Sequence, residues 1–317
     1  MKNLLYIKIL LGVLILSGCK SCPTKTNEST ILDYDNILIY SDLSSRMDKS
    51  PNDTVIIGQL IDYFKNECVK PGIKVNDRSA ITFSRINYFK SKCASAKIDI
   101  GEFKKLEEKQ LFVNDKSKNG NLSDSINNFK NIVNCNYKEH DFGGLDILSL
   151  IYNEINSGNI VKKTSQIIGE NDTTTINYHN HLFIFTDGYL EYDKDNGNNE
   201  FFFGVPQIEN LRRYCIKNNI SLENAIKNKP DFKLRPLRSE YNQLVNLYVL
   251  ETYDRGLNIA TGTLKHTGEL SDNNILKTIW QVWAEESGFK SFVWKSSITK
   301  QSSSLKDYIK NLIQNQN

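Results

Sequence analysis

In "ILIYSDLSSRM" (residues 37–47) an apolar run passes directly into oxygen-bearing side chains, and this pattern is the strongest indication of the fold. Residues 36–41 are almost continuously β-branched, aliphatic or aromatic, which is typical of a strand buried on both faces. Strands of this kind lie in the centre of parallel sheets. Asp42 and Ser44 follow directly where this predicted strand ends.

Two later apolar runs end in carboxylates in the same way. "HLFIFTDGYLEY" (181–192) contains Asp187, and "NLYVLETYD" (246–254) contains Glu251 and Asp254. Shorter strand patterns cover residues 79–86 and 291–296, and helical patterns cover residues 54–70, 123–134, 145–155 and 273–288. Strands alternating with helices predict an α/β fold with a doubly wound, mostly parallel, Rossmann-like sheet flanked by helices.

The carboxyl ends of such strands form the edge where α/β proteins bind ligands. Asp42, Ser44 and Asp187 are all expected at that edge, although they come from distant parts of the sequence. Ligation by oxygen atoms alone suits a hard cation, so Mg²⁺ is the expected ion, with Mn²⁺ or Ca²⁺ as alternatives. We therefore take Asp42, Ser44 and Asp187 as candidate metal ligands.

Three motifs in order, "SDLSS", "FGGLDIL" and "FTDG", resemble the metal-ion-dependent adhesion site of the von Willebrand factor type A (vWA) family. The resemblance covers most of residues 36–299. It implies a vWA-type fold and a module that binds proteins or other carboxylate-bearing ligands through a metal, without turning over a substrate. The metal ligands that it implies are Asp42, Ser44 and Asp187.

The chain departs from this family pattern at two ligand positions. Arg46 stands where the family has a second serine, and Leu145 stands where it has a threonine. An arginine near the site would be able to replace the cation by pairing with Asp42 and Asp187. An offset of the second loop would instead supply a ligand from His140, Asp141 or Asp146. Two alternatives therefore remain: a working metal site, and a degenerate site that holds no metal.

The N-terminus reads as a signal peptide over residues 1–18. Lysines flank an apolar run that is too short to span a bilayer, and the run ends in "LSGC". This ending resembles the bacterial lipobox, which implies lipid attachment at Cys19. An uncleaved anchor, or an unmodified cysteine after an ordinary signal, is the alternative. Residues 19–35 read as a polar tether, and the chain is expected to lie at the cell membrane or outer membrane, facing the periplasm or exterior.

Composition and charge limit the remaining classes. The chain has 317 residues, of which 39% are hydrophobic and 24% charged, as expected for a folded domain with a core. Its formal charge of +3 predicts no general affinity for nucleic acid. We predict one domain over residues 36–299, with insertions near 97–120 and 205–240, and a C-terminal tail over 300–317 that carries a short exposed helix.

Four cysteines lie beyond the leader and tether: Cys68, Cys93, Cys135 and Cys215. They allow three pairings that the sequence does not separate, and buried free thiols are as good an expectation as one disulfide. The four histidines have no ligand spacing with these cysteines, so the sequence does not favour a zinc site.

Two further patterns have a plain structural interpretation. Residues 212–238 are rich in Lys and Arg, with two aromatic residues between them. A solvated helix and loop is the first interpretation, and a surface that binds acidic partners is the second. Trp280 and Trp283 are expected to pack in the core.

The sequence contains no nucleophile elbow, zinc-protease motif, phosphate-binding loop or dinucleotide fingerprint. A metal-assisted hydrolase built on Asp42 and Asp187 is the remaining enzyme hypothesis, but Ser44 stands where such phosphatases commonly place a second acid. We therefore rank a binding module for adhesion or scaffolding as the first hypothesis. A metal-independent interaction domain is the second, and a hydrolase is the third. The partner is a protein or a carboxylate-bearing ligand of unknown identity.

Overall fold

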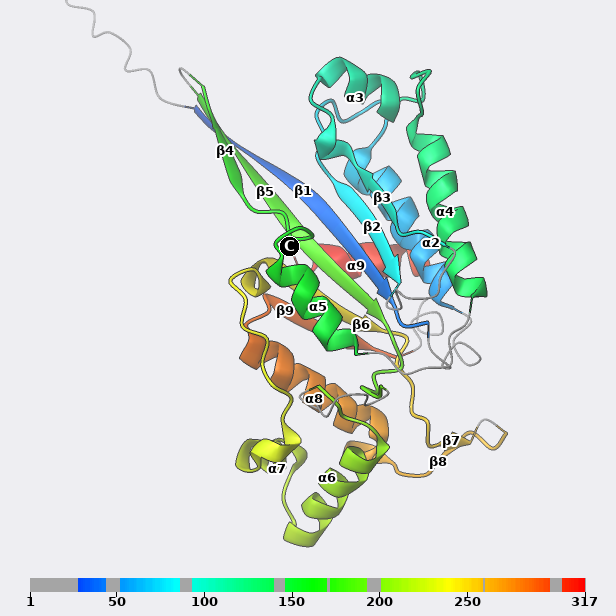
Figure 1. Ribbon diagram of the computed structural model, residues 1–317, viewed down its shortest axis with the longest axis vertical. Helices are drawn as coiled ribbons and strands as arrows, with labels where there is room; N and C mark the ends of the chain where they lie inside the picture. The colour runs from blue at the N-terminus through cyan, green and yellow to red at the C-terminus, as the bar shows by residue number, and fades with distance from the viewer. Residues whose placement is uncertain are drawn as a thin grey trace, which may run out of the picture. The chain divides into compact units, whose positions relative to one another are not determined.

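The computed structural model describes residues 28–43, 52–85, 93–139, 146–169, 172–192, 201–258, 260–296 and 304–316. This part of the chain is α/β, with a seven-stranded mixed sheet and eight α-helices (Figure 1). The chain forms two compact units, Met1–Leu32 with Ser165–Ile176, and Asp33–Thr164 with Asn177–Asn317.

The strands are β1 (Glu28–Ser41), β2 (Ala80–Arg85), β3 (Ala96–Asp99), β4 (Ser165–Ile168), β5 (Asp172–Phe185), β6 (Val245–Leu250), β7 (Leu257–Asn258), β8 (Thr263–Leu264) and β9 (Ser291–Lys295). The helices are α2 (Asp53–Tyr63), α3 (Leu106–Val113), α4 (Leu122–Lys138), α5 (Ile147–Asn156), α6 (Val205–Asn218), α7 (Leu222–Asn228), α8 (Asp272–Ser287) and α9 (Leu305–Gln314). A π-helical turn, η2 (Phe64–Val69), extends α2.

The main sheet has the order β3-β2-β1-β5-β6-β9. The pairs β1–β2, β5–β6 and β6–β9 are parallel, and the edge strand β3 is antiparallel. The order turns between β1 and β5: β2 and β3 extend it on one side, and β6 and β9 on the other. A reversal of this kind is the topological switch point at which doubly wound sheets bind ligands.

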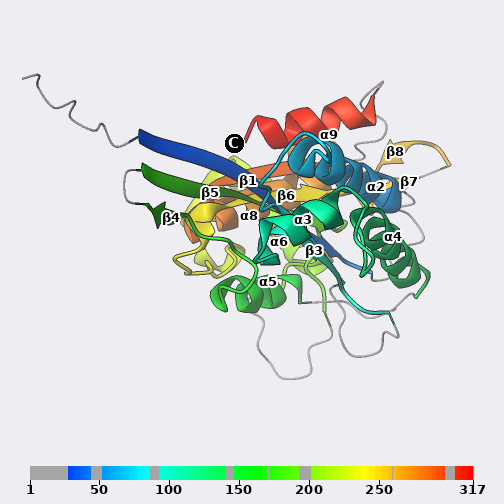
Figure 2. The same cartoon turned by 90° about the horizontal axis from the view of Figure 1, so that it is seen from above.

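Alternate side chains of the central strands enter two separate cores. Leu38 and Tyr40 of β1 join the core under α5, α6, α7 and α8, whereas Ile37 and Ile39 join the core under α2, α4 and α9. Figure 2 shows α2 and α9 on one side of the sheet and α5 on the other. Because both faces are covered, the central strands are apolar at nearly every position, as the opening stretch predicted.

Local signals fix the ends of the flanking helices. The Asn121 side chain caps α4 by accepting a hydrogen bond from the Asp124 amide at 2.8 Å. Helix α8 begins after the capping side chain of Ser271 and ends at Gly288, which has φ +78°. Such left-handed termini favour glycine because it has no Cβ. Trp280 and Trp283 of α8 are buried in the core, which confirms the prediction for both.

The smaller unit contains a β-hairpin. Strand β4 pairs with the first part of β5 in antiparallel register, from Ser165 opposite Ile176 to Ile168 opposite Thr173. The hairpin's β-branched threonines, Thr173 to Thr175, favour strand structure.

The predicted α/β, doubly wound class is confirmed, and two strand boundaries and the exposure of the C-terminal helix are corrected. Residues 28–35, expected within the tether, belong to β1. The apolar strand before Asp187, expected to begin at residue 181, begins at Asp172 and ends at Phe185. The C-terminal helix forms as predicted, but it is not simply exposed, because Ile309 and Ile313 are fully buried in the core beside α2. Their spacing of four residues places both on one face of α9.

Candidate functional site

Asp42 and Asp187 lie at the same edge of the sheet, beside the switch point. The Asp42 amide donates to the Phe185 carbonyl at 2.9 Å, and the Thr186 hydroxyl donates to Asp42 Oδ2 at 3.1 Å. Asp42 is 4% exposed and Asp187 is 1% exposed. Ser44, Arg46, His140, Asp141, Leu145 and Cys19 lie outside the described residues.

The loop after β5 is held in one tight conformation. Asp187 Oδ1 accepts from the Tyr189 amide at 3.1 Å, and Thr186 Oγ1 accepts from the Gly188 amide at 3.2 Å. Gly188 has φ +94°, and a Cβ there would lie 2.5 Å from the ring of Trp294. This position therefore requires glycine. The "TDG" sequence thus fixes the turn that orients the Asp187 side chain.

Arg255 binds Asp187 on its second oxygen. The Nε and Nη2 atoms of Arg255 lie 2.9 Å and 2.8 Å from Asp187 Oδ2. Its Nη1 pairs with Glu191, and its guanidinium lies 4.1 Å from the centre of the Tyr189 ring. We call Asp42, Thr186, Asp187, Tyr189 and Arg255 the rim cluster.

The sequence predicted an arginine near this site and pointed to Arg46, which lies outside the described residues. Arg255 is an arginine at the site that the sequence analysis did not consider. The available signal was the third strand, which ends near Glu251 and Asp254, immediately before Arg255. Asp254 Oδ1 accepts from the Gly256 amide at 2.7 Å, which turns the chain after Arg255.

A second layer of ion pairs supports the rim cluster. The Tyr189 hydroxyl donates to Asp272 at 2.8 Å and accepts from the Arg255 amide at 3.1 Å. Asp272 also pairs with Arg212, whose other carboxylate partner is Glu209 at 2.8 Å. Arg212 is 3% exposed. It is therefore a buried structural residue, and the solvated surface expected over 212–238 does not include it.

Electrostatics keep the Arg255 guanidinium charged. Burial opposes its charge, but the carboxylates of Asp187 and Glu191 outweigh that effect and raise the pKa of Arg255 above its ordinary value. Burial raises the pKa of Tyr189, so its hydroxyl stays protonated and able to donate to Asp272.

The end of β6 contributes a backbone outlier to the same edge. Glu251 has φ +59° and is 5% exposed. A left-handed conformation is uncommon for a residue other than glycine, and such outliers cluster at functional sites. The Thr186 amide donates to the Leu250 carbonyl at 3.2 Å, so the β5 and β6 ends are adjacent.

The described residues fit a divalent cation poorly at Asp187. One of its oxygens accepts two N–H groups from Arg255, and the other accepts the Tyr189 amide. Within the described ranges, no three His, Cys, Asp or Glu side chains are arranged to hold a metal ion. The third candidate ligand, Ser44, is not among these residues, and Asp146 caps α5 by accepting from the Ser149 amide at 3.0 Å. Binding of Mg²⁺, Mn²⁺ or Ca²⁺ stays a prediction.

A second polar cluster lies on the face of the sheet under α2. His181 Nδ1 lies 3.0 Å from the Tyr248 hydroxyl, and His181 Nε2 lies 3.3 Å from Asp35 Oδ1. The Cys68 thiol donates to Asp35 Oδ2 at 3.2 Å. We call Asp35, Cys68, His181 and Tyr248 the inner cluster; sequence reasoning did not identify it.

Burial controls the titration of the inner cluster. Desolvation lowers the pKa of His181 and raises the pKa of the Cys68 thiol well above its ordinary value. Burial also opposes ionisation of Asp35, but the hydrogen bond with His181 prevails and lowers the pKa of Asp35. The arrangement is therefore a neutral histidine beside an ionised carboxylate and a protonated thiol.

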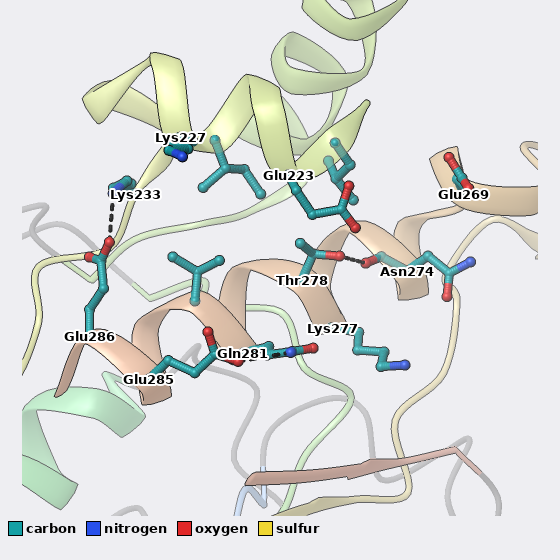
Figure 3. A pocket seen from close by; sticks show the side chains of 13 residues that line it. Glu223, Lys227, Lys233, Glu269, Asn274, Lys277, Thr278, Gln281, Glu285 and Glu286 are labelled. Carbon is teal, nitrogen blue, oxygen red and sulfur yellow. Dashed lines mark hydrogen bonds and ion pairs between the residues drawn. The ribbon is translucent and has the colours of Figure 1, made fainter. Parts of the chain in front are cut away.

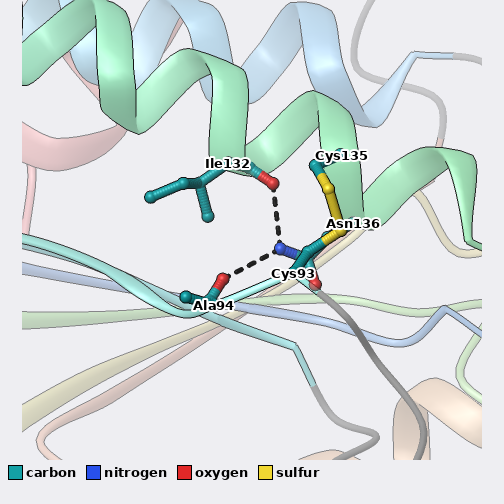
Figure 4. Close-up of a disulfide and its surroundings, with 5 residues drawn as sticks. All are labelled: Cys93, Ala94, Ile132, Cys135 and Asn136. Atoms are coloured by element: carbon teal, nitrogen blue, oxygen red, sulfur yellow. Dashed lines mark hydrogen bonds between the residues drawn. A yellow bond between two sulfur atoms is a disulfide. The ribbon is translucent and has the colours of Figure 1, made fainter.

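One disulfide joins Cys93 to Cys135, with 6.0 Å between their Cα atoms (Figure 4). Cys68 and Cys215 are free and buried. Beside the bridge, the Asn136 amide group donates to the Ala94 carbonyl at 3.1 Å, which also ties α4 to the chain leading into β3. Of the alternatives that the sequence left open, the structure has one disulfide and two buried thiols.

A pocket of about 640 Å³ lies between α7 and α8 (Figure 3). Its lining carries both signs of charge, including Glu223, Lys227, Lys277 and an ion pair between Lys233 and Glu286. The mixed charges indicate a solvated cleft and favour no particular class of ligand.

None of the helices in the described part of the chain combines the length and apolar character needed to cross a membrane. A scan against models of known protein families finds no match, and neither does a search of curated proteins.

Proposed function

We propose that this protein is a lipid-anchored, extracytoplasmic vWA-like module that binds a partner at the rim cluster, for adhesion or scaffolding. One observation carries the proposal: Asp42 and Asp187, which the sequence assigned to one ligand edge, meet beside the topological switch point. The rim presents charged groups that are only partly buried, since the side chains of Arg255 and Glu191 are 32% and 29% exposed.

The cell-envelope location is supported by the cysteines and the leader. Disulfides persist in oxidising compartments, and Cys93 and Cys135 form one. The short apolar leader ending in Cys19 has the pattern of a lipoprotein signal. The proposed location is the cell membrane or outer membrane, with the domain facing the periplasm or exterior.

Of the two binding hypotheses, the geometry favours the metal-independent interaction domain, because Arg255 already supplies a positive charge to Asp187. The proposed partner is a protein or another carboxylate-bearing ligand. Its identity is left to experiment.

The binding proposal is tested by chemical cross-linking on intact cells that carry the tagged full chain. The rim variant is Asp187→Asn with Arg255→Gln, which removes both charges and keeps a polar side chain at each position. Its matched control is Lys97→Gln with Glu102→Gln, an exposed ion pair 2.5 Å long. Residue 97 lies on β3, which runs antiparallel to β2, so this pair lies toward the opposite edge of the sheet.

We expect a cross-linked species in wild type and in the control variant that disappears in the rim variant, at equal amounts of folded protein in the membrane. A species that survives unchanged in the rim variant would contradict binding at the rim. The anchor is tested separately by labelling cells with a fatty-acid analogue, and label that does not depend on Cys19 would contradict it.

A further inference from the structure

A buried carboxylate such as Asp187 requires a positive partner. It is 1% exposed, and an ionised carboxylate without compensation is strongly disfavoured in a protein interior. In metal-binding α/β proteins a divalent cation can meet this need. In this chain the described partner with a full positive charge is Arg255.

Arg255 contacts Asp187 in a geometry that would conflict with a metal ion. Two of its nitrogen atoms, Nε and Nη2, lie 2.9 Å and 2.8 Å from Asp187 Oδ2. A divalent cation bound to this oxygen would lie at about 2.0–2.6 Å from it, in the space that the guanidinium N–H groups take. Occupation of Oδ2 by the guanidinium and by a metal is therefore mutually exclusive.

The guanidinium is fixed from three sides. It stacks on the Tyr189 ring at 4.1 Å, and the Tyr189 hydroxyl accepts from the backbone amide of Arg255 at 3.1 Å. Its Nη1 pairs with Glu191, whose other carboxylate oxygen accepts from the Val205 amide at 2.9 Å, at the first turn of α6. A side chain held in this way has lost its rotamer freedom before any ligand arrives.

We propose that Arg255 is the resident cation of the rim cluster and excludes divalent metal ions from Asp187. The chain then differs from metal-dependent modules of similar layout by having a permanent charge at its ligand edge. Its rim would be insensitive to chelators, and its binding state would not follow the divalent metal concentration. This inference concerns the site of the proposed function but not the identity of its partner.

The test measures Mn²⁺ binding to the full-length protein in mild detergent by electron paramagnetic resonance of free Mn²⁺. Three chains are compared with wild type: Arg255→Gln, Asp187→Asn, and the double variant that carries both substitutions. We expect Arg255→Gln to bind Mn²⁺ at least tenfold more tightly than wild type, and the double variant to lose that gain. Asp187→Asn is expected to leave the weak binding of wild type unchanged.

Two results would overturn the proposal: a Mn²⁺ site in wild type that Asp187→Asn removes, or no gain in a folded Arg255→Gln chain. If Arg255→Gln does not fold, the comparison of wild type with Asp187→Asn still decides. Arg255→Lys, which keeps the charge, serves as a control and should exclude Mn²⁺ as wild type does. Metal binding is measured without a partner, so its outcome is independent of the cross-linking test.

Discussion

The rim cluster and the inner cluster are built on the same two neighbouring strands, yet they differ in what holds them. The inner cluster takes Asp35 from β1 and His181 from β5, and the His181 side chain is 0% exposed. The rim cluster takes its central pair, Asp187 and Arg255, from loops, and the Arg255 side chain is 32% exposed. A polar network locked between strands can serve stability alone, whereas one carried on loops at a ligand edge can also meet a partner.

If the inner cluster is structural, its disruption should give the largest loss of stability. His181→Ala removes a buried ring and leaves Asp35 and the Tyr248 hydroxyl without their histidine contacts. Cavity formation and the loss of a partner for a buried carboxylate predict a loss of about 4 kcal/mol in the free energy of unfolding. Urea denaturation followed by circular dichroism measures it.

The matched control is His179→Ala, because His179 lies two residues earlier on β5 and reaches Asp33 at 3.5 Å on a partly exposed surface. We expect this control to cost less than about 1 kcal/mol. Equal losses in the two variants would show that the inner cluster does not stabilise the fold as a buried network.

The inner cluster also predicts a pH dependence. The pKa of His181 is lowered in the folded state from its ordinary value of 6.5, so the unfolded chain binds more protons just below that pH. The contribution is fully present above pH 6.5 and is lost as pH falls toward the folded pKa. The slope for one proton is at most about 1.4 kcal/mol per pH unit.

Thermal or urea unfolding from pH 7 to pH 5 measures this slope in wild type and in His181→Gln, whose amide does not titrate. We expect a shallower slope in the variant. Asp35 has the same sign, because its pKa is also lowered, but it acts below its ordinary value of 3.8 and outside this window. A variant as pH-sensitive as wild type would assign the slope to other groups.

The rim cluster was easier to predict from the sequence than the inner cluster, and the reason is physical. The meeting of Asp42 and Asp187 was predictable, because each follows an apolar strand and parallel strands end at one edge. The partner of Asp187 was not predictable. Arg255 lies five residues beyond the end of β6, and the direction of its side chain depends on the conformation of that loop and on stacking with Tyr189.

The inner cluster was missed although its residues are visible in the sequence. Asp35 and His181 stand at the edges of apolar runs, where polar residues are ordinarily read as the end of a strand. Only the register of β1 against β5 brings them together, and register depends on pairing between distant segments. The same limit applies to Cys93 and Cys135, since strand and helix patterns do not specify which cysteines meet.

The amphipathic pattern of α9 indicated a buried face, and the prediction of an exposed helix did not use it. Ile309 and Ile313 repeat at a spacing of four residues within "LKDYIKNLI", which indicates one buried face. Leu305, Tyr308 and Leu312 of the same helix also pack against the core beside α2. Its place in the core beside α2 follows from that apolar face.

The smallest expected effect comes from removing one tyrosine hydroxyl from each cluster. Tyr189→Phe removes the acceptor of the Arg255 amide but keeps the ring under the guanidinium, and Tyr248→Phe removes the hydroxyl that contacts His181. Each should cost about 1 kcal/mol. Hydrogen exchange at the Arg255 amide should accelerate about fivefold in Tyr189→Phe, because about 1 kcal/mol of local opening energy is lost there, and should stay near the wild-type rate in Tyr248→Phe. Equal acceleration in both variants would mean that the rim loop opens only when the whole domain unfolds, and the rim would then be as rigidly held as the inner cluster.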